Sequence, residues 1–132
     1  MKTWPKNPVI YEINTWVWLR ELGQKCQMPV NLATVPPEEW DQIASLGFDA
    51  VWFMGVWERS PAGIEIAMRN KGLLEDFRRA LPDFSAEDNV GSPYCVRRYV
   101  VDERLGGPVG LTVGEASRKR FLQRVIRWST KP

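Results

Sequence analysis

The sequence contains no histidine in its 132 residues, and this absence removes several kinds of functional site at once. His-ligated metal centres, Ser–His or Cys–His nucleophilic pairs and the commonest general base of enzymes all need an imidazole ring. Any catalysis by this chain would therefore use carboxylates. The sequence shows no recognisable cluster of calcium-type ligands either. We therefore predict no metal and no cofactor.

Cysteine and long apolar runs are also scarce. Cys26 and Cys95 lie far apart and match no metal-ligand or redox spacing, so we interpret both as reduced thiols. No apolar run approaches the ~20 residues that span a bilayer, and the first residues lack the apolar centre of a secretory signal. These absences predict a soluble, cytoplasmic protein with no membrane partner.

The composition that remains is typical of one globular domain, with 44% hydrophobic and 26% charged residues. Seven tryptophans are present, and most are expected in the core or at its edge. Charge is distributed unevenly. From Glu115 onward there are six basic residues and one acidic residue, a net charge of +5, whereas the preceding part has twelve basic and fifteen acidic residues, a net charge of −3.

Apolar patterning in the first half of the chain predicts a strand, a helix and a second strand. Residues 9–14 are β-branched and aromatic, which favours a buried strand. Residues 38–46 show one apolar helical face after a pair of prolines, and Gly47 is predicted to end this helix. Residues 48–57 are apolar almost throughout, as in a strand that is covered on both faces of a parallel sheet. Together they predict a βαβ unit with adjacent parallel strands.

Other segments give weaker patterns. Residues 15–35 contain Gly23 and Pro29 and show no sustained period, so we predict a long loop or a mixture of short pieces there. Residues 64–70 and 73–81 are predicted to be helical, and the apolar side chains of the second helix are expected to lie over the sheet.

The segment GSPYCVRRYVVDERLGGP, residues 91–108, combines two tyrosines and three arginines with turn-forming residues, and we predict a long loop. Just before it, Ser85 and Asp88 resemble a capping box that opens a short helical turn. Considered without further context, the residues favour a structural role, in which half-buried Tyr94 and Tyr99 hold the loop and arginines lie over their rings as cation–π partners.

The order of these motifs resembles the start of the catalytic barrel of the alpha-amylase family, glycoside hydrolase family 13. The segment YEIN is similar to the first barrel strand, WDQIASLGFDAVWFMGVWE to the first helix and second strand, and GSPYCVRRYVVDERLGG to the loop that leads toward the third helix–strand pair. The resemblance implies an α/β fold that is a partial TIM barrel, with the first two to three βα units of a (β/α)8 barrel in residues 1–111. Residues 112–132 are then a divergent, basic amphipathic helix.

The resemblance also implies candidate substrate-binding residues. Tyr94 matches the family's tyrosine that forms a stacking platform beneath the sugar at the cleavage point. Asn14 and Trp57 lie at or near the carboxyl ends of the two predicted strands, the side on which barrel enzymes build their sites. Two positions depart from the family pattern: Arg98 stands where the family commonly has Asp, and Glu103 where it commonly has Pro.

No catalytic residue is assigned. A retaining glycosidase needs a nucleophilic and an acid/base carboxylate ~5–5.5 Å apart, and in the family these come from the fourth and fifth barrel strands, beyond the region of resemblance. Glu12, Asp49 and Glu58 form no credible pair on spacing alone. We therefore expect a truncated glycoside hydrolase domain of carbohydrate metabolism, whose parent enzyme acts on alpha-glucosidic bonds by a retaining mechanism and which is inactive alone.

The expected partner is an alpha-glucan or an oligosaccharide. One alternative is a non-catalytic sugar-binding module. A less favoured one is a binder of nucleic acid or of anionic surfaces, which would use the basic segment at residues 112–132. Because so few strands are predicted, the open edges of the sheet would allow the chain to associate with itself.

Overall fold

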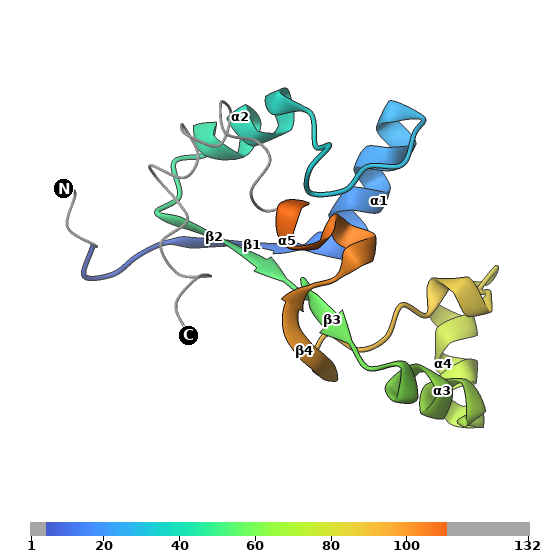
Figure 1. Cartoon of the computed structure of the whole chain (residues 1–132). Coiled ribbons are helices and arrows are strands. Elements are labelled where there is room, and N and C mark those ends of the chain that lie inside the picture. The colour runs from blue at the N-terminus through green and yellow to red at the C-terminus, as the bar shows by residue number, and fades with distance from the viewer. Residues whose placement is uncertain (1–4, 111–132) are drawn as a thin grey trace.

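The computed structural model describes residues 5–110, which form a mixed α/β arrangement (Figure 1). The predicted basic helix over residues 112–132 lies outside this range. The elements follow one another as β1 (Ile10–Asn14), α1 (Thr15–Cys26), α2 (Pro37–Ser45), β2 (Ala50–Met54), β3 (Trp57–Arg59), α3 (Pro61–Arg69), α4 (Lys71–Ala80), the 3-10 turn η1 (Ala86–Asp88), β4 (Val96–Val101), the 3-10 turn η2 (Glu103–Leu105) and α5 (Gly107–Gly110).

Strands β1 and β2 are parallel and adjacent, as predicted from the βαβ pattern. Their register runs from Ile10 opposite Ala50 to Asn14 opposite Met54. The two strands are the parallel pair of the fold, whereas β3 and β4 form a separate antiparallel pair. Within residues 5–110 the strands form two two-stranded sheets and do not close into a barrel.

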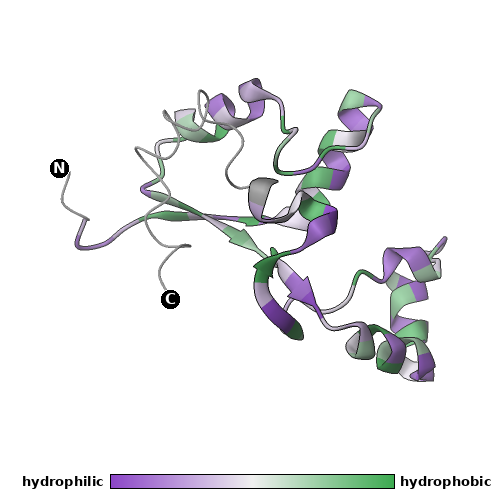
Figure 2. Cartoon of the chain, viewed as in Figure 1, coloured by the Kyte–Doolittle hydropathy of each residue, from purple (hydrophilic) through white to green (hydrophobic). Residues whose placement is uncertain are grey.

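The β1–β2 pair is covered on one face only, which corrects the prediction of strands that are buried on both faces. On the covered face, Ile13 and Phe53 pack against Ile43 of α2. On the opposite face, Ile10 and Trp52 are 53% and 54% exposed, although both strands are hydrophobic along much of their length (Figure 2). An apolar strand is suited to burial on both faces, but burial of the second face also needs another element that packs against it.

Helix α2 forms as the sequence predicts. Pro37 occupies its first turn, where a missing N–H costs nothing, and Gly47 follows its last turn with a φ of +76°. Trp40 and Ala44 pack beside Ile43 in the core. Leu46, which was also expected on this face, is exposed because the helix ends before it.

Residues 15–35 were predicted to be a long loop or a mixture of short pieces, but their first part is the twelve-residue helix α1. The buried residues Thr15, Leu19 and Leu22 are spaced i, i+4 and i+7, so they line one face of the helix. Gly23 allows the end of the helix to approach the following chain closely, since a Cβ built there would lie 3.2 Å from the Met28 carbonyl oxygen. The glycine that suggested a loop is therefore a packing residue within a helix.

The predicted strand over residues 48–57 is two strands. Gly55 adopts a φ of +76°, a backbone conformation that residues other than glycine rarely adopt. It turns the chain between β2 and β3. β3 then pairs antiparallel with β4, which lies inside the segment predicted to be a loop. Register shifts on both sides of Glu58 make this ribbon irregular. Residues 58–59 thus belong to a strand.

A second core lies where α1, the chain after it and η2 meet. Its buried residues are Leu19, Leu22, Leu32, Val35, Val56, Val101 and Leu105. Leu105 is 2% exposed, and its carbonyl accepts a hydrogen bond of 3.0 Å from the Leu32 backbone N–H. This core holds the carboxyl end of the β1–β2 pair against the segment that starts at residue 91.

Helices α3 and α4 pack on each other and not over the β1–β2 sheet, which corrects the prediction for residues 73–81. They form a hairpin beside β3 (Figure 1), and neither helix contains a buried residue. Phe77 of α4 instead lies against Phe84, with 5.2 Å between ring centroids. The capping box predicted at Ser85 and Asp88 is confirmed, with both reciprocal hydrogen bonds present.

Candidate functional site

The indole of Trp16, on the first turn of α1, lies at the centre of a group of charged side chains. Its Nε1–H donates a hydrogen bond of 3.0 Å to the Gly55 carbonyl oxygen, at the turn that follows β2. The guanidinium carbons of Arg104 and Arg59 lie 4.6 Å and 5.1 Å from its ring centroid, within the range of cation–π attraction. The ring therefore connects the ends of both parallel strands with the segment after residue 91.

Arg59 is buried at the end of β3. Its guanidinium donates hydrogen bonds to the Gly91 carbonyl oxygen and, at 3.3 Å, to the Gly55 carbonyl oxygen. Burial lowers the pKa of Arg59, and the nearby Arg104 lowers it further. Arg59 thus fixes the start of the 91–108 segment, and glycine suits position 91 because a Cβ there would lie 3.3 Å from the Arg59 side chain.

Asp102, which is 4% exposed, holds Arg104 in a bidentate pair. Its two carboxylate oxygens accept hydrogen bonds of 2.9 Å and 2.8 Å from the Arg104 guanidinium, and one also accepts the Arg104 backbone N–H at 3.0 Å. Burial alone would raise the pKa of Asp102, but the hydrogen bonds from Arg104 outweigh it and the pKa is lowered. Asp102 is therefore an ionised structural residue that orients Arg104 toward Trp16.

Glu58 of β3 makes ion pairs with two arginines of β4. Its carboxylate accepts a hydrogen bond of 3.1 Å from Arg97 and one of 2.9 Å from the Arg98 Nε–H. The hydrogen bond from Arg98 is the main cause that lowers the pKa of Glu58. Arg98, which departs from the family pattern, thus has a partner in this chain, across the β3–β4 ribbon.

The two tyrosines of residues 91–108, of which Tyr94 is a candidate for sugar binding, are both highly exposed. Tyr94 is 86% exposed in the turn before β4, and Tyr99 is 79% exposed on β4. The interpretation of half-buried rings beneath arginines is therefore wrong, and the cation–π contacts form on Trp16 instead. Because most of the surface of these two rings is exposed, the rings are available to a ligand.

The structure brings Trp57 to Tyr99 but does not join the three candidate residues. Trp57 packs against the second core and meets the Tyr99 ring edge to face, with 5.9 Å between centroids. Asn14 is exposed at the carboxyl end of β1, directly before α1. Among the described residues, no hydrogen bond joins Asn14 to Tyr94 or to Trp57. Their role in binding stays a prediction.

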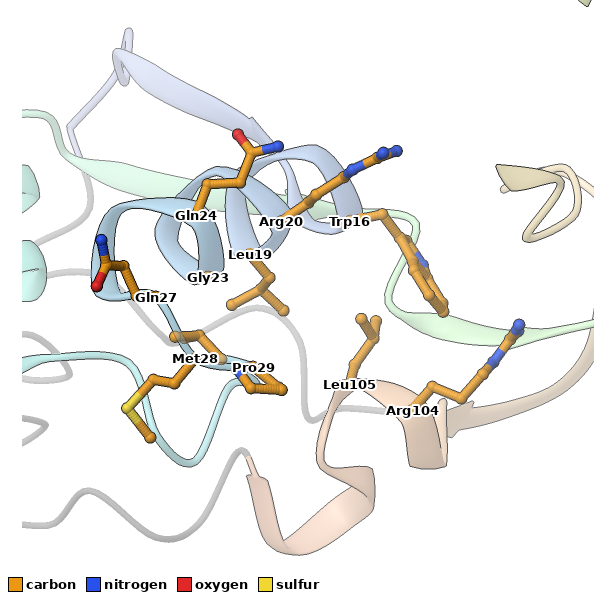
Figure 3. A pocket seen from close by; sticks show the side chains of 11 residues that line it. Trp16, Leu19, Arg20, Gly23, Gln24, Gln27, Met28, Pro29, Arg104 and Leu105 are labelled. Carbon is orange, nitrogen blue, oxygen red and sulfur yellow. The ribbon is translucent and has the colours of Figure 1, made fainter. Parts of the chain in front are cut away.

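A shallow open groove of about 540 Å³ lies between α1, the turn after it and η2 (Figure 3). Trp16 and Arg104 stand at one end of the groove and Met28 and Pro29 at the other. It is lined mainly by apolar side chains, and none of the three predicted site residues contributes to it.

Sequence reasoning missed Trp16, Arg59 and Asp102 as a connected group. One signal was available: Arg59 lies just after an apolar strand segment, where a charged side chain needs a partner. Its partners Gly91 and Trp16 are more than 30 positions away, so spacing could not identify them.

Within residues 5–110, no three potential metal-ligating side chains gather in one place, and no helix has the length and apolar character needed to cross a membrane. Cys26 and Cys95 are free thiols, as interpreted from their spacing. The anionic-surface alternative depends on residues 112–132, which lie outside the described residues, so it stays a prediction.

Comparison with protein-family models, with curated proteins and with solved structures finds no match for this chain.

Proposed function

We propose that this chain is related to the amino-terminal part of an alpha-amylase-like barrel and that it binds alpha-glucan oligosaccharides without cleaving them. The observation that carries the proposal is a set of aromatic residues in the β3–β4 region, which we call the aromatic ribbon: the exposed Tyr94 and Tyr99 and the half-buried Trp57. The motif order and the parallel β1–β2 pair support the relation to the barrel.

The aromatic ribbon has the chemistry that sugars require. A pyranose presents an apolar face of C–H groups, and an aromatic ring offers a flat apolar surface with little rotamer freedom to lose. Trp57 holds the Tyr99 ring from its edge, which leaves the faces of that ring for other contacts. Glu58 and its two arginine partners belong to the same pair of strands and would supply polar groups for hydroxyls.

The carboxylates in the described part of the chain favour binding over hydrolysis. A general acid of a glycosidase needs a raised pKa so that it is protonated near neutral pH. Among residues 5–110, the carboxyl groups with a shifted pKa are Glu58, Asp88 and Asp102, and in each the pKa is lowered. Hydrogen bonds from arginines lower the pKa of Glu58 and Asp102, and hydrogen bonds from Ser85 lower that of Asp88, so all three carboxylates are poor proton donors.

The proposal is tested by titrating the protein with maltoheptaose while tryptophan fluorescence is recorded. We expect a saturable change in fluorescence, because a sugar on Tyr99 alters the surroundings of Trp57. A cello-oligosaccharide of equal length, with the same atoms in a different linkage, provides the control ligand and should bind more weakly. A reducing-sugar assay should show no products from either ligand.

Matched variants locate the site. Tyr94→Ala and Tyr99→Ala should each weaken maltoheptaose binding severalfold, whereas Tyr94→Phe and Tyr99→Phe keep the rings and should retain most of the affinity. Both positions are exposed, so the alanine variants should unfold at the same urea concentration as the parent. The proposal fails if the alanine variants bind like the parent or if no sugar binds.

A further inference from the structure

The second face of the β1–β2 pair, which we call the bare face, carries large apolar side chains that the other described elements leave exposed. It contains Ile10, Glu12 and Asn14 of β1 and, opposite them in register, Ala50, Trp52 and Met54 of β2. Ile10 and Trp52 are more than half exposed. Exposure of large apolar side chains to water is unfavourable, so covering this face would stabilise the fold.

The bare face is too small for a stable interface with a second copy. Two strands about 4.8 Å apart and about 17 Å long present a flat area of roughly 160 Å². A stable interface buries about 800 Å² on each partner. A single helix, about 10 Å wide, matches the width of two strands. The dimensions therefore favour one helix over another globular surface.

The segment at residues 111–132 supplies the side chains that such a helix needs. Phe121, Leu122, Val125 and Ile126 form one apolar stripe at helical spacing. The stripe matches the apolar character of the bare face, and the segment is long enough to contain three helical turns around it.

Charge favours the same pairing. Residues 5–110 contain eleven basic and fifteen acidic side chains, a net charge of −4, whereas residues 111–132 carry +5. Glu12 is exposed in the middle of the bare face, directly opposite Trp52. None of the ion pairs among the described residues includes Glu12. A basic segment on this face would give this carboxylate an opposite charge.

The chain leaves the described region close enough to reach the bare face. The Gly107 backbone N–H donates to the Asp102 carbonyl oxygen at 3.1 Å, and the Asp102 N–H donates to the Val56 carbonyl oxygen at 2.9 Å. Helix α5 therefore begins beside the chain that follows β2. Seven extended residues, 111–117, span about 23 Å, which exceeds the length of either strand.

We propose that residues 118–128 bind the bare face of the β1–β2 pair through the stripe of Phe121, Leu122, Val125 and Ile126. The segment then completes the core from the side that α1 and α2 leave open. This inference is independent of sugar binding, because the aromatic ribbon belongs to the other sheet.

The test measures how fast a thiol on the bare face reacts with a maleimide in the full-length chain. Ile10→Cys provides the thiol, in a background in which Cys26→Ser and Cys95→Ser remove the native thiols. We expect slow labelling in this parent and labelling at least severalfold faster when Leu122→Asp and Ile126→Asp disrupt the stripe. Gln123→Asp with Arg127→Gln changes the net charge by the same two units on the opposite side of the helix and should leave labelling slow.

Equal labelling rates in the parent and the stripe variant would overturn the proposal. Slow labelling that becomes fast on dilution would also overturn it, since a second copy would then be the cover. Near-ultraviolet circular dichroism checks that each variant remains folded. A second measurement avoids the aspartates: Ile10→Cys with Leu122→Cys should form a disulfide within monomers, and disulfide-linked dimers alone would contradict the inference.

Discussion

The two faces of the β1–β2 pair both carry large apolar side chains but have very different surroundings. On the covered face, Trp18 and Trp40 meet Phe53 at centroid distances of 6.1 Å and 5.8 Å, and Ile13 is 6% exposed. On the bare face, Trp52 is more than half exposed. The difference shows that a strand's sequence sets which side chains share a face, whereas neighbouring elements set whether that face contributes to stability.

The largest expected effect comes from a matched pair of isoleucines in β1. Ile13→Ala should lower the free energy of unfolding by about 3 kcal/mol, because it removes buried contacts with Ile43 and leaves a cavity. Ile10→Ala should lower it by less, about 1 kcal/mol, because the described elements leave more than half of that side chain exposed and only the proposed contact with residues 118–128 would cover it. Urea unfolding measures both values. Equal losses would mean that the two faces are equally covered in solution.

A second contrast between crowded and open surroundings involves the glycines near the two ends of β2. Gly47 and Gly55 both have a φ of +76°, so alanine is strained at either position. A Cβ at Gly55 would lie 2.7 Å from the Arg59 guanidinium and 3.3 Å from Pro93, whereas nothing lies within 4 Å at Gly47. Gly55→Ala should cost about 2 kcal/mol and Gly47→Ala about 1 kcal/mol.

Thermal unfolding followed by circular dichroism would rank these two variants against the parent. If Gly47→Ala proved as damaging as Gly55→Ala, the backbone conformation alone, without the contacts around Arg59, would account for both losses.

The smallest expected effect concerns the ionised carboxylate of Asp102 and depends on pH. Because its folded-state pKa is lowered, its contribution to stability is present above the usual pKa of about 3.9 and is lost as the pH falls through the lower value. Asp102→Asn should therefore cost about 1 kcal/mol at pH 7, and the difference from the parent should shrink toward pH 2.

Glu58→Gln is the control for this pH dependence. The pKa of Glu58 is also lowered, but its arginine partners are well exposed, so solvent screens the pair and the loss at pH 7 should be smaller. Urea unfolding of the parent and of both variants at pH 7 and near pH 2 gives the comparison. A difference between parent and Asp102→Asn that stays constant with pH would contradict the role assigned to the carboxylate.

The local elements that sequence patterns predicted correctly are those whose signals lie within a few residues. The helix after Pro37, the glycine at position 47 and the capping box at Ser85 depend on neighbouring side chains and backbone groups. Helix α1 was missed because Gly23 weakens the apparent period, although the face formed by Leu19 and Leu22 supports a helix.

The role of the candidate site residues in binding stays a prediction. Tyr94 was identified from its motif and Trp57 from its place near the end of a predicted strand, and the structure places Trp57 against Tyr99. The group around Trp16 was not, because cation–π contacts and carbonyl hydrogen bonds join side chains that are far apart in the sequence. Such contacts leave no periodic pattern.

The sequence by itself determined the parallel βαβ unit, the absence of an imidazole and the segment in which aromatic residues and arginines alternate. Only the tertiary structure decided that Gly55 divides one apolar run into two strands, that Tyr94 and Tyr99 are exposed, and that one face of β1–β2 lacks cover. The physical reason is the distance along the sequence over which each effect acts. Backbone propensity and side-chain periodicity act over a few residues, whereas burial depends on which distant elements pack against each face.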